Sequence, residues 1–314
     1  MSIAILGGGA FGTALALTLS ADGTPVTLWI RDAEEAGAMT ASRRTGRRLP
    51  GLDLPPSLAV TSDMPDAELT LLTVPAQTVR AFLERHAHTL ASRSLVTCAK
   101  GIERRTGLGP VSVVTDTLPG TRAGILTGPS FAVDIARGLP TALVLAMPDV
   151  TEDEQAALSR PALRVYRTDD VAGAELGGAL KNVIALAAGM AIGAGLGDSA
   201  RAALIARGFA EMTRFTVRGG GRPETLAGLS GLGDLVLTAT SDKSRNFAAG
   251  CALGRGETLD SSVTVEGVAT AQALAETSTP DDMPITHAVA AVTRGDMGVI
   301  DATDALLARP MRKE

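Results

Sequence analysis

A glycine pattern near the start of the chain constrains its fold more than any other feature. Residues 7–12 read GGGAFG and fit the spacing G-x-G-x-x-G; an apolar, strand-like stretch at 3–6 precedes them and an Ala- and Leu-rich stretch follows. In this context Gly7 permits a tight turn, Gly9 lets backbone approach a ligand, and Gly12 lets helix and strand pack closely. The chain has 35 glycines, so a turn that binds nothing is the alternative. The context favours a loop that holds a dinucleotide pyrophosphate at a helix N-terminus.

The first half of the chain alternates short β-branched runs with stretches of helical period, among them 76–90 and 130–137. Such alternation indicates βαβ units, and therefore an α/β Rossmann domain with a parallel sheet and helices on both faces. Right-handed crossovers would place the ligand loops at one edge of the sheet. The candidate strands are residues 3–6, 26–30, 69–74, 95–99, 124–126, 142–146 and, less distinctly, 164–166.

The pattern changes after about Thr168. From Asp170 onward apolar residues recur at helical spacing, as in 200–217 and 268–276, and no strand alternation is convincing. We therefore expect an NAD(P)-binding domain at 1–168, followed by an all-α substrate domain at 169–314. The cleft between two such domains is the default position for an active site.

Composition excludes several classes of protein. With 314 residues, 45% of them hydrophobic and 20% charged, the chain is globular, and its net charge of −5 argues against a general nucleic-acid or anionic-membrane binder. Cys98 and Cys251 are too few for a disulfide framework or a zinc site and indicate reduced thiols in a cytoplasmic protein. His86, His88 and His287 support no metal site. The motifs for a ligand must therefore be sought elsewhere.

Two apolar segments invite a membrane interpretation. The first basic residue of the chain is Arg31, so the apolar segment 1–20 lacks the basic n-region of a signal peptide. The run at 183–197 has about 15 residues and falls short of the roughly 20 that span a bilayer. It predicts a buried core helix.

The end of the second expected strand discriminates between nicotinamide cofactors, because an acidic residue there binds the NAD ribose and an arginine suits the NADP 2′-phosphate. The sequence has Arg31 followed by Asp32, and four more arginines follow at 43, 44, 47 and 48. These arginines could also be a solvated face. NADP is favoured, and NAD stays open.

Reduction of a ketone by hydride needs a proton donor, and lysine suits that role because burial lowers its pKa. Only four of the 29 basic residues are lysines. Lys181 lies in the apolar stretch LGGALKNVIA, where it is either a catalytic amine or a lysine snorkelling from a domain edge. Lys100 ends the fourth expected strand in CAKG, where an ordinary exposed lysine is the alternative. Both are candidates for chemistry.

Three further motifs bear on these lysines. TGPSFA at 127–132 follows a strand and offers backbone N–H groups and a hydroxyl. GLGDLVLT at 231–238 places Asp234 and Thr238 on one helical face. SRN at 244–246 sets a permanent cation beside two neutral hydrogen-bonding groups, which is typical of a phosphate clamp.

Taken in order along the chain, GGGAFGTALA, CAKG, TGPSFA, LGGALKNVIA, GLGDLVLT, SRN and VEG at 265–267 resemble the NAD(P)-dependent glycerol-3-phosphate dehydrogenase family, bacterial type. The resemblance covers nearly the whole chain. It implies interconversion of dihydroxyacetone phosphate and sn-glycerol 3-phosphate, which supplies phospholipid synthesis in the cytoplasm, and a possible homodimer formed through the helical domain.

The resemblance also implies site residues. Lys181 would be the general acid/base, Lys100 would lie between nicotinamide and substrate, and Asp234 would be their charge partner. The other implied substrate contacts are Gly128, Ser130, Asn182, Thr238, Ser244, Arg245 and Asn246. The implied cofactor contacts are Gly7, Gly9, Ala10, Phe11, Gly12, Arg31, Lys100, Ala132, Arg245, Thr264 and Glu266.

The chain departs from the family pattern at three places. Ala10 and Phe11 stand where relatives have Ser or Asn with Tyr or Trp, SRN is followed by Phe247-Ala-Ala instead of charge, and 256–264 is several residues short. The short segment leaves Thr264 the weakest of the implied contacts.

Two alternatives stay open from the sequence. One is another dehydrogenase of the same architecture, acting on 6-phosphogluconate, ketopantoate or an opine. The other is a non-catalytic NAD(P)-binding regulator, although Lys100, Lys181 and Asp234 are all present.

Overall fold

The computed structural model of the chain describes residues 1–91, 93–259 and 264–309. Its internal contacts divide the chain into two compact units. Unit 1 comprises 1–99 and 110–174, and unit 2 comprises 100–109 and 175–314. The change between the units therefore falls six residues after the expected boundary at 168/169, and the short segment 100–109 belongs with the second unit although it lies within the first in sequence.

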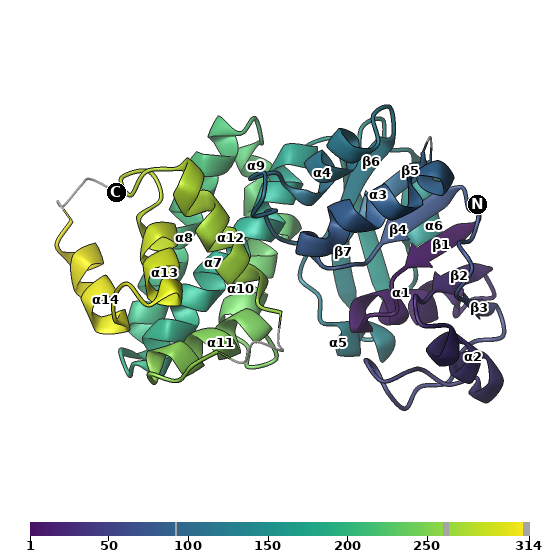
Figure 1. The fold of residues 1–314 in the computed structure, drawn as a ribbon, viewed down its shortest axis with the longest axis horizontal. Helices are drawn as coiled ribbons and strands as arrows, with labels where there is room; N and C mark the ends of the chain where they lie inside the picture. Colours follow the sequence, from purple (N-terminus) through teal and green to yellow (C-terminus); the bar gives the residue numbers. More distant parts are fainter. Residues whose placement is uncertain (92, 260–263, 310–314) are drawn as a thin grey trace. The chain divides into compact units, whose positions relative to one another are not determined.

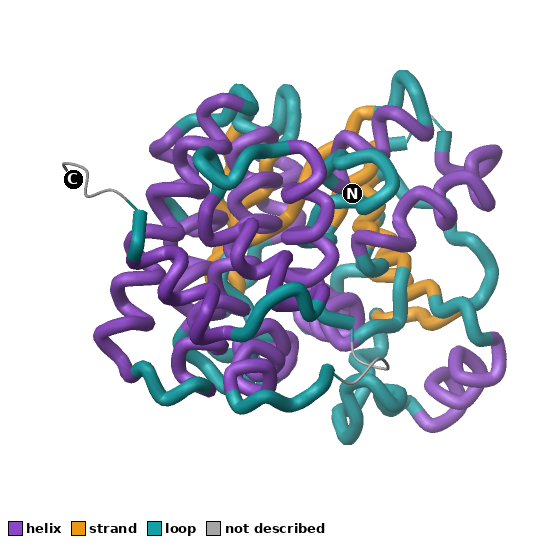
Figure 2. Tube along the Cα trace, turned by 60° about the vertical axis from the view of Figure 1, so that its left-hand side comes forward, coloured by secondary structure: helices purple, strands orange, loops and turns teal. Residues whose placement is uncertain are grey.

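Unit 1 contains a single eight-stranded sheet with the strand order β3-β2-β1-β4-β5-β6-β7-β8. Figure 2 shows the strands of this sheet in orange and the helices, which also run between the strands in sequence, in purple. In the first unit β1 pairs in parallel with both β2 and β4, so that Ile3 lies beside Val26 and Leu69. The strands are β1 Ile3–Leu6, β2 Val26–Trp29, β3 Leu58–Thr61, β4 Leu69–Leu72, β5 Ser94–Thr97, β6 Arg122–Thr127, β7 Thr141–Ala146 and β8 Leu163–Thr168.

The prediction of a parallel sheet is correct from β3 to β6 along the sheet and wrong at one pairing. β6 and β7 are antiparallel, and β8 is parallel to β7. The cause is the connecting helix α5 (Ala132–Ala136), which has five residues. A helix of that length rises about 7 Å, whereas a six-residue strand extends about 20 Å, so α5 cannot return the chain to the starting edge of the sheet.

The remaining helices of unit 1 are α1 Ala10–Ser20, α2 Ala33–Ser42, α3 Val79–Leu90 with the short helix η1 Ala76–Thr78 before it, α4 Pro110–Thr117 and α6 Glu152–Leu158. Local sequence explains several of their starts. Asp32 caps α2 by accepting hydrogen bonds from the N–H groups of Glu34 and Glu35. Thr151 and Glu154 form a capping box on α6. The core packs α1 against buried residues such as Ile5 and Leu28 of the sheet.

Sequence reasoning missed β3. Its four residues, LAVT, are too few to show alternation, and only Leu58 of the four is buried. The strand forms because it pairs with β2 in register, with Val26 beside Leu58. A short edge strand depends on its neighbour more than on its own sequence.

Unit 2 is helical in every described element, and Figure 1 shows these helices in teal, green and yellow. They are α7 Val171–Gly193 (which starts in unit 1), α8 Gly197–Arg218, α9 Pro223–Ala227, the π-turn η2 Leu229–Gly233, α10 Asp234–Ala239, α11 Arg245–Gly254, α12 Glu266–Thr277, α13 Pro284–Arg294 and α14 Val299–Leu307.

The central helix α7 is longer than the apolar run that predicted it. With 23 residues, this helix is long and apolar enough to cross a membrane by length and composition. However, 83% of its 18-residue apolar stretch is buried inside the protein. Residues such as Val183, Ile184 and Leu186 lie in the core of unit 2. The expectation of a buried core helix is confirmed.

Glycines bring α7 and α11 into backbone contact. A Cβ on Gly189 or Gly193 of α7 would meet the carbonyl oxygens of Phe247 or Cys251 on α11. Likewise a Cβ on Gly250 would meet the carbonyl oxygen of Leu186. The absence of side chains at these crossing points lets the two helices approach closely, which brings the start of α11 beside the middle of α7.

Candidate active site

The glycine-rich loop has the geometry that its spacing predicts. Gly7 has φ +132°, and a Cβ there would approach Thr73 Oγ1 to 2.8 Å. A Cβ on Gly12 would meet the Gly7 carbonyl oxygen, so both positions need glycine to keep α1 close to β1. Gly9 differs, because the space around a Cβ there is open. The first turn of α1, including Ala10 and Phe11, has no side-chain cap and offers backbone N–H groups to an anion.

The structure separates the roles of Arg31 and Asp32. Asp32 turns toward the start of α2, where it accepts the two capping hydrogen bonds, and Arg47 approaches its other oxygen to 4.0 Å. The Arg31 side chain is exposed after β2. The sequence alone could not separate these two neighbours, because the capping bonds form only once α2 starts at Ala33.

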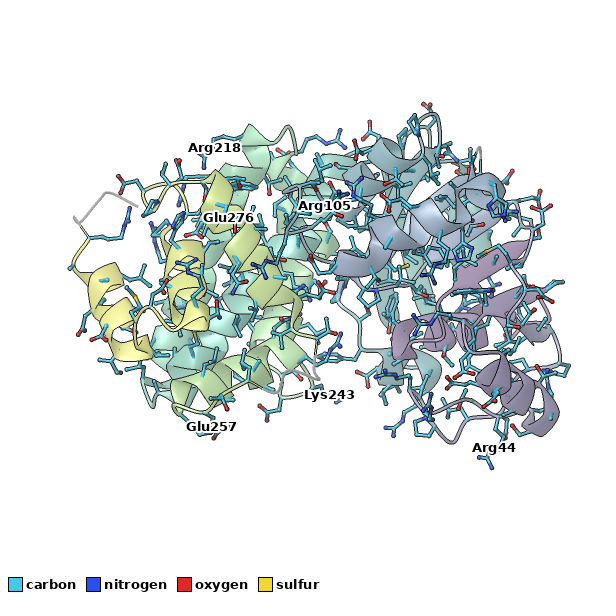
Figure 3. The ribbon with its side chains drawn as sticks, viewed as in Figure 1. Arg44, Arg105, Arg218, Lys243, Glu257 and Glu276 are labelled. Carbon is cyan, nitrogen blue, oxygen red and sulfur yellow. The ribbon has the colours of Figure 1, made fainter. Side chains whose placement is uncertain are left out.

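Most of the downstream arginines contact protein groups. Arg43 donates to the carbonyl oxygens of Leu58 and Pro55, and Arg44 projects outward (Figure 3) and pairs with Asp53 at 3.5 Å. Arg47 pairs with Glu35 at 3.6 Å. These three therefore stabilise the loop after α2, and the interpretation of the cluster as a solvated, structural face applies to them.

TGPSFA forms the turn between β6 and α5. Gly128 has φ +135°, and a Cβ there would approach the carbonyl oxygen of Ala142 to 3.1 Å, so the turn requires glycine. Ser130 Oγ donates to the Gly128 carbonyl oxygen at 3.1 Å. Ser130 and Ala132 are half-buried.

Four predicted residues of unit 2 form one hydrogen-bonded cluster. The Asp234 carboxylate accepts from Lys100 Nζ at 2.6 Å through Oδ2 and from Lys181 Nζ at 3.1 Å through Oδ1. Lys181 Nζ also donates to Thr238 Oγ1 at 2.7 Å, and Thr238 donates to Asp234 Oδ1 at 3.2 Å. Residues 134 positions apart thus meet at one carboxylate. We call these four residues the lysine–aspartate cluster.

Burial decides between the two interpretations of the lysines. The Lys181 side chain is 7% exposed and the Asp234 side chain 2%, so Lys181 is not a snorkelling surface lysine. Lys100 is 16% exposed and ion-paired, so it is not an ordinary exposed lysine either. With two ammonium groups on one carboxylate, the cluster holds an excess of positive charge where water is scarce. Such a site stabilises an oxyanion.

The cluster changes the protonation of its members. Desolvation lowers the pKa of Lys181 from 10.5 to about 8; Asp234 opposes this shift, and the charges of Lys100 and Arg245 add to it. Burial alone raises the pKa of Asp234, but the two ammonium groups outweigh burial and hold that pKa below its ordinary value. An amine with a pKa near neutrality can both give and accept a proton under physiological conditions.

A tight turn positions Asp234. The π-turn η2 leads directly into α10, and a Cβ on Gly231 would meet the backbone of Leu226. Gly177 of α7 likewise approaches the carbonyl oxygen of Ser230, where a Cβ would stand 3.0 Å away. These close approaches hold α10 with Asp234 and Thr238 facing α7, as the i, i+4 spacing predicts.

A chain of amides joins the start of α11 to the cluster. Asn182 Nδ2 donates to the Lys100 carbonyl oxygen at 2.9 Å, and Asn182 Oδ1 accepts from Asn246 Nδ2 at 2.8 Å. Asn246 Oδ1 in turn accepts from the N–H of Gly267 at 2.9 Å. This chain of amides could not be predicted from the sequence, because its three links join residues that are 82, 64 and 21 positions apart.

The SRN motif begins α11. Ser244 caps the helix by accepting from the N–H of Phe247 at 3.2 Å, and it is buried. Arg245 follows as the first helical residue, and its side chain is exposed. A guanidinium at a helix N-terminus is well placed for a phosphate.

The last two predicted residues begin α12. Thr264 is exposed and follows residues 260–263, which lie outside the described part of the chain and belong to the segment expected to be short. Glu266 is half-buried in the first turn of α12. Across the described ranges no group of three His, Cys, Asp or Glu side chains could hold a metal ion. Neither Cys98 nor Cys251, both in the described ranges, forms a disulfide.

Comparison with known proteins identifies the family to which the chain belongs. The sequence model of the NAD-dependent glycerol-3-phosphate dehydrogenase N-terminus matches residues 2–153, and that of the C-terminus matches 170–304. The chain belongs to this family. The glycerol-3-phosphate dehydrogenase [NAD(P)+] of Ruegeria sp. is 55% identical over the full length of both chains, and that of Roseobacter denitrificans is 53% identical over the same extent.

A solved structure of a glycerol-3-phosphate dehydrogenase has the same fold. The crystal structure of the enzyme from Coxiella burnetii superimposes with a TM-score of 0.89, covers 98% of this chain and 99% of its own, and shares 34% identity. The Rossmann-type sheet and the helical unit described above are thus the glycerol-3-phosphate dehydrogenase architecture. The prediction of the family from the ordered motifs is confirmed.

Proposed function

We propose that the protein is an NAD(P)-dependent sn-glycerol-3-phosphate dehydrogenase that interconverts dihydroxyacetone phosphate and sn-glycerol 3-phosphate and supplies the latter to phospholipid synthesis. The observation that carries the proposal is the lysine–aspartate cluster, which a chain of this family retains intact. A non-catalytic regulator would have no need of a buried and a half-buried ammonium group on one buried carboxylate, because burying charge is costly.

In ketone reduction Lys181 would be the general acid. Its ammonium has three N–H bonds, and among the described residues two of them are directed at Asp234 and Thr238. The third would donate to the substrate oxygen as negative charge develops there, and the neutral amine would take a proton back in the reverse reaction. Lys100 would stabilise the same oxygen as a second cation, and Asp234 would keep both amines in position.

The substrate phosphate would bind at the start of α11. Arg245 supplies an exposed guanidinium there, beside Ser244 and Asn246. Asn182 reaches the same region through its hydrogen bond to Asn246. In unit 1, Gly128 and Ser130 would contribute the polar groups of the β6–α5 turn.

The dinucleotide would bind to unit 1, and when bound it supplies or accepts the hydride. The open space at Gly9 and the uncapped N–H groups of Ala10 and Phe11 fit a pyrophosphate, while Gly7 and Gly12 hold the turn. Further contacts are proposed for Lys100, Ala132, Arg245, Thr264 and Glu266, as the family motifs imply.

NADP is the preferred cofactor in this proposal. Capping of α2 occupies the Asp32 carboxylate, which is the group that would otherwise bind the ribose of NAD. Arg31 is exposed immediately before it and suits the 2′-phosphate. NAD stays permitted, because Arg31 does not obstruct a 2′-hydroxyl.

We also propose a homodimer formed through the helical unit, and a cytoplasmic location. Exposed apolar side chains on α8 and α14, Val217, Ile300 and Leu307, support a contact surface in that unit. The molar mass measured by light scattering tests this assignment, with about twice 32.0 kDa expected.

A spectrophotometric assay tests the proposed activity. Purified protein with NADPH or NADH should consume the reduced cofactor when dihydroxyacetone phosphate is added, and not with ketopantoate or without substrate. The reverse assay with NADP should oxidise sn-glycerol 3-phosphate and not 6-phosphogluconate. Turnover of another substrate, or binding of cofactor with no turnover at all, would favour one of the two alternatives.

A further inference from the structure

The segment 100–109 carries Lys100 but is held by unit 2. Lys100 lies three residues after the end of β5 and is the first residue of this stretch that belongs to unit 2. An ion pair 2.6 Å long between Lys100 Nζ and Asp234 needs this backbone fixed to within a fraction of an ångström. Two hydrogen bonds from unit 2 fix it.

The first bond is made by Asn182, whose Nδ2 donates to the Lys100 carbonyl oxygen at 2.9 Å. The second is made by Thr270, in the middle of α12, whose Oγ1 accepts from the N–H of Ile102 at 3.2 Å. Thr270 is completely buried, and Ile102 is 1% exposed and belongs to the core of unit 2. Loss of this acceptor would remove a buried hydrogen bond, which is costly.

We propose that Thr270 is a positioning residue for Lys100: by accepting the Ile102 N–H it holds the segment 100–102 on α12 and directs the Lys100 ammonium at Asp234. The proposal rests on the proposed role of Lys100 in catalysis. Thr270 itself touches no member of the lysine–aspartate cluster in the hydrogen bonds described, so it acts through the backbone of its neighbour.

The far end of the segment is equally constrained. A Cβ on Gly109 would lie against the carboxylate of Glu175, the first residue of the second stretch of unit 2, so a side chain there would displace that carboxylate. Within the segment, the N–H of Glu103 donates to the Leu108 carbonyl oxygen at 2.8 Å and closes a loop. The segment is therefore a short loop fixed at both ends, and Thr270 holds the end that bears the catalytic amine.

A substitution at Thr270 separates positioning from general stability. Thr270→Val keeps the shape and removes the acceptor, and we expect kcat to fall about tenfold, in line with the loss of one buried hydrogen bond that holds the segment. The KM for NADPH should stay unchanged, and Thr270→Ser, which keeps the hydroxyl, should restore kcat. Thr216→Val is the matched control, because Thr216 is equally buried in the same unit and its hydroxyl has no hydrogen-bond partner among the residues that the structure describes.

A double-mutant cycle with Lys100→Met gives the decisive result. If Thr270 acts through Lys100, adding Thr270→Val to Lys100→Met should lower kcat no further; additive losses would overturn the proposal. Near-normal activity of Lys100→Met alone would instead refute the proposed role of Lys100. Should the valine variant not fold, Thr270→Ala enters the same cycle, with the same two outcomes.

The pH profile gives a readout that a purely structural role would not move. Lys181 faces Asp234 on α10, Lys100 after β5 and Arg245 on α11, and the charge of Lys100 contributes to the lowered pKa of Lys181. Displacement of Lys100 in Thr270→Val should therefore shift the alkaline limb of kcat/KM for reduction to higher pH, as Lys100→Met should. An unshifted limb together with reduced kcat would contradict positioning.

Discussion

The glycine-rich loop of unit 1 and the lysine–aspartate cluster of unit 2 differ in the chemical groups that they would present to a ligand. The loop offers backbone: the first turn of α1 has no side-chain cap, and Gly7 and Gly12 are required because side chains there would meet neighbouring atoms. The cluster offers side chains: the buried Lys181 and the half-buried Lys100 both donate to the buried Asp234 carboxylate. A backbone site tolerates different ligands of similar charge, whereas a buried charge cluster is tuned for one proton transfer. Substitutions in the cluster should therefore lower the rate of turnover, whereas substitutions in the loop should weaken cofactor binding.

The largest effect should come from Lys181→Met. Removal of a general acid typically costs about 10²–10⁴ in rate, so turnover should fall at least about a hundredfold. Cofactor affinity should persist, because the loop of unit 1 is untouched. Steady-state kinetics and a fluorescence titration with NADPH measure the two quantities. Near-normal turnover would refute the role of Lys181 as the proton donor.

Arg245→Ala should have the next largest effect. A charge-assisted hydrogen bond to phosphate is worth roughly 1.5–3 kcal/mol, or about 10- to 150-fold in affinity. The KM for dihydroxyacetone phosphate should rise by that factor, with a smaller loss of NADPH affinity. Unphosphorylated dihydroxyacetone is the control substrate, because it lacks the group that Arg245 would bind. An equal effect on both substrates would mean that Arg245 is not the phosphate anchor.

Arg31→Ala should change cofactor preference rather than rate. Loss of a guanidinium from the 2′-phosphate should weaken NADPH about tenfold or more and leave NADH nearly unchanged. Dissociation constants of both cofactors, measured for the wild type and the variant, check this. Should the variant keep the wild-type ratio of NADPH to NADH affinity, Arg31 does not contact the 2′-phosphate.

The smallest expected effects are on stability, where alanine at Gly9 and alanine at Gly12 of the glycine-rich loop should have different melting temperatures. Gly9→Ala should leave the melting temperature nearly unchanged, since the space around its Cβ is open and its φ of −69° suits alanine. It should weaken cofactor binding, because the methyl group faces the expected pyrophosphate. Gly12→Ala should lower the melting temperature, since its Cβ would meet the Gly7 carbonyl oxygen. Equal melting temperatures for the two variants would contradict this distinction.

The same contrast explains what the sequence could predict. Gly7, Gly9 and Gly12 were identifiable because the strand, turn and helix that use them are continuous in the chain. The Lys100–Asp234 pair spans 134 positions, so spacing could nominate its members but not bring them together. Only the resemblance to a family linked them. The capping of α2 by Asp32 and the anchoring of Ile102 by Thr270 depend on atomic positions that no residue pattern encodes.

The fold shows the same limit. Periodicity located the strands with many buried residues and missed β3, whose pairing with β2 matters more than its composition. The antiparallel β7 follows from the length of α5, which the sequence pattern overestimated as 130–137. The contacts of Gly189 and Gly193 with α11 were invisible, because a glycine in a helix does not reveal which neighbour it admits.

The pH dependence of kcat/KM, measured in both directions, tests the central claim most directly. Lys181 is the proposed proton donor and acceptor. Burial lowers the pKa of this lysine to about 8. Reduction needs the ammonium form, so kcat/KM for dihydroxyacetone phosphate should fall as the pH rises through about 8. Oxidation needs the neutral amine, so kcat/KM for sn-glycerol 3-phosphate should rise through the same pH. Limbs near the ordinary lysine pKa of 10.5, or limbs that run in the same direction for both reactions, would contradict the account.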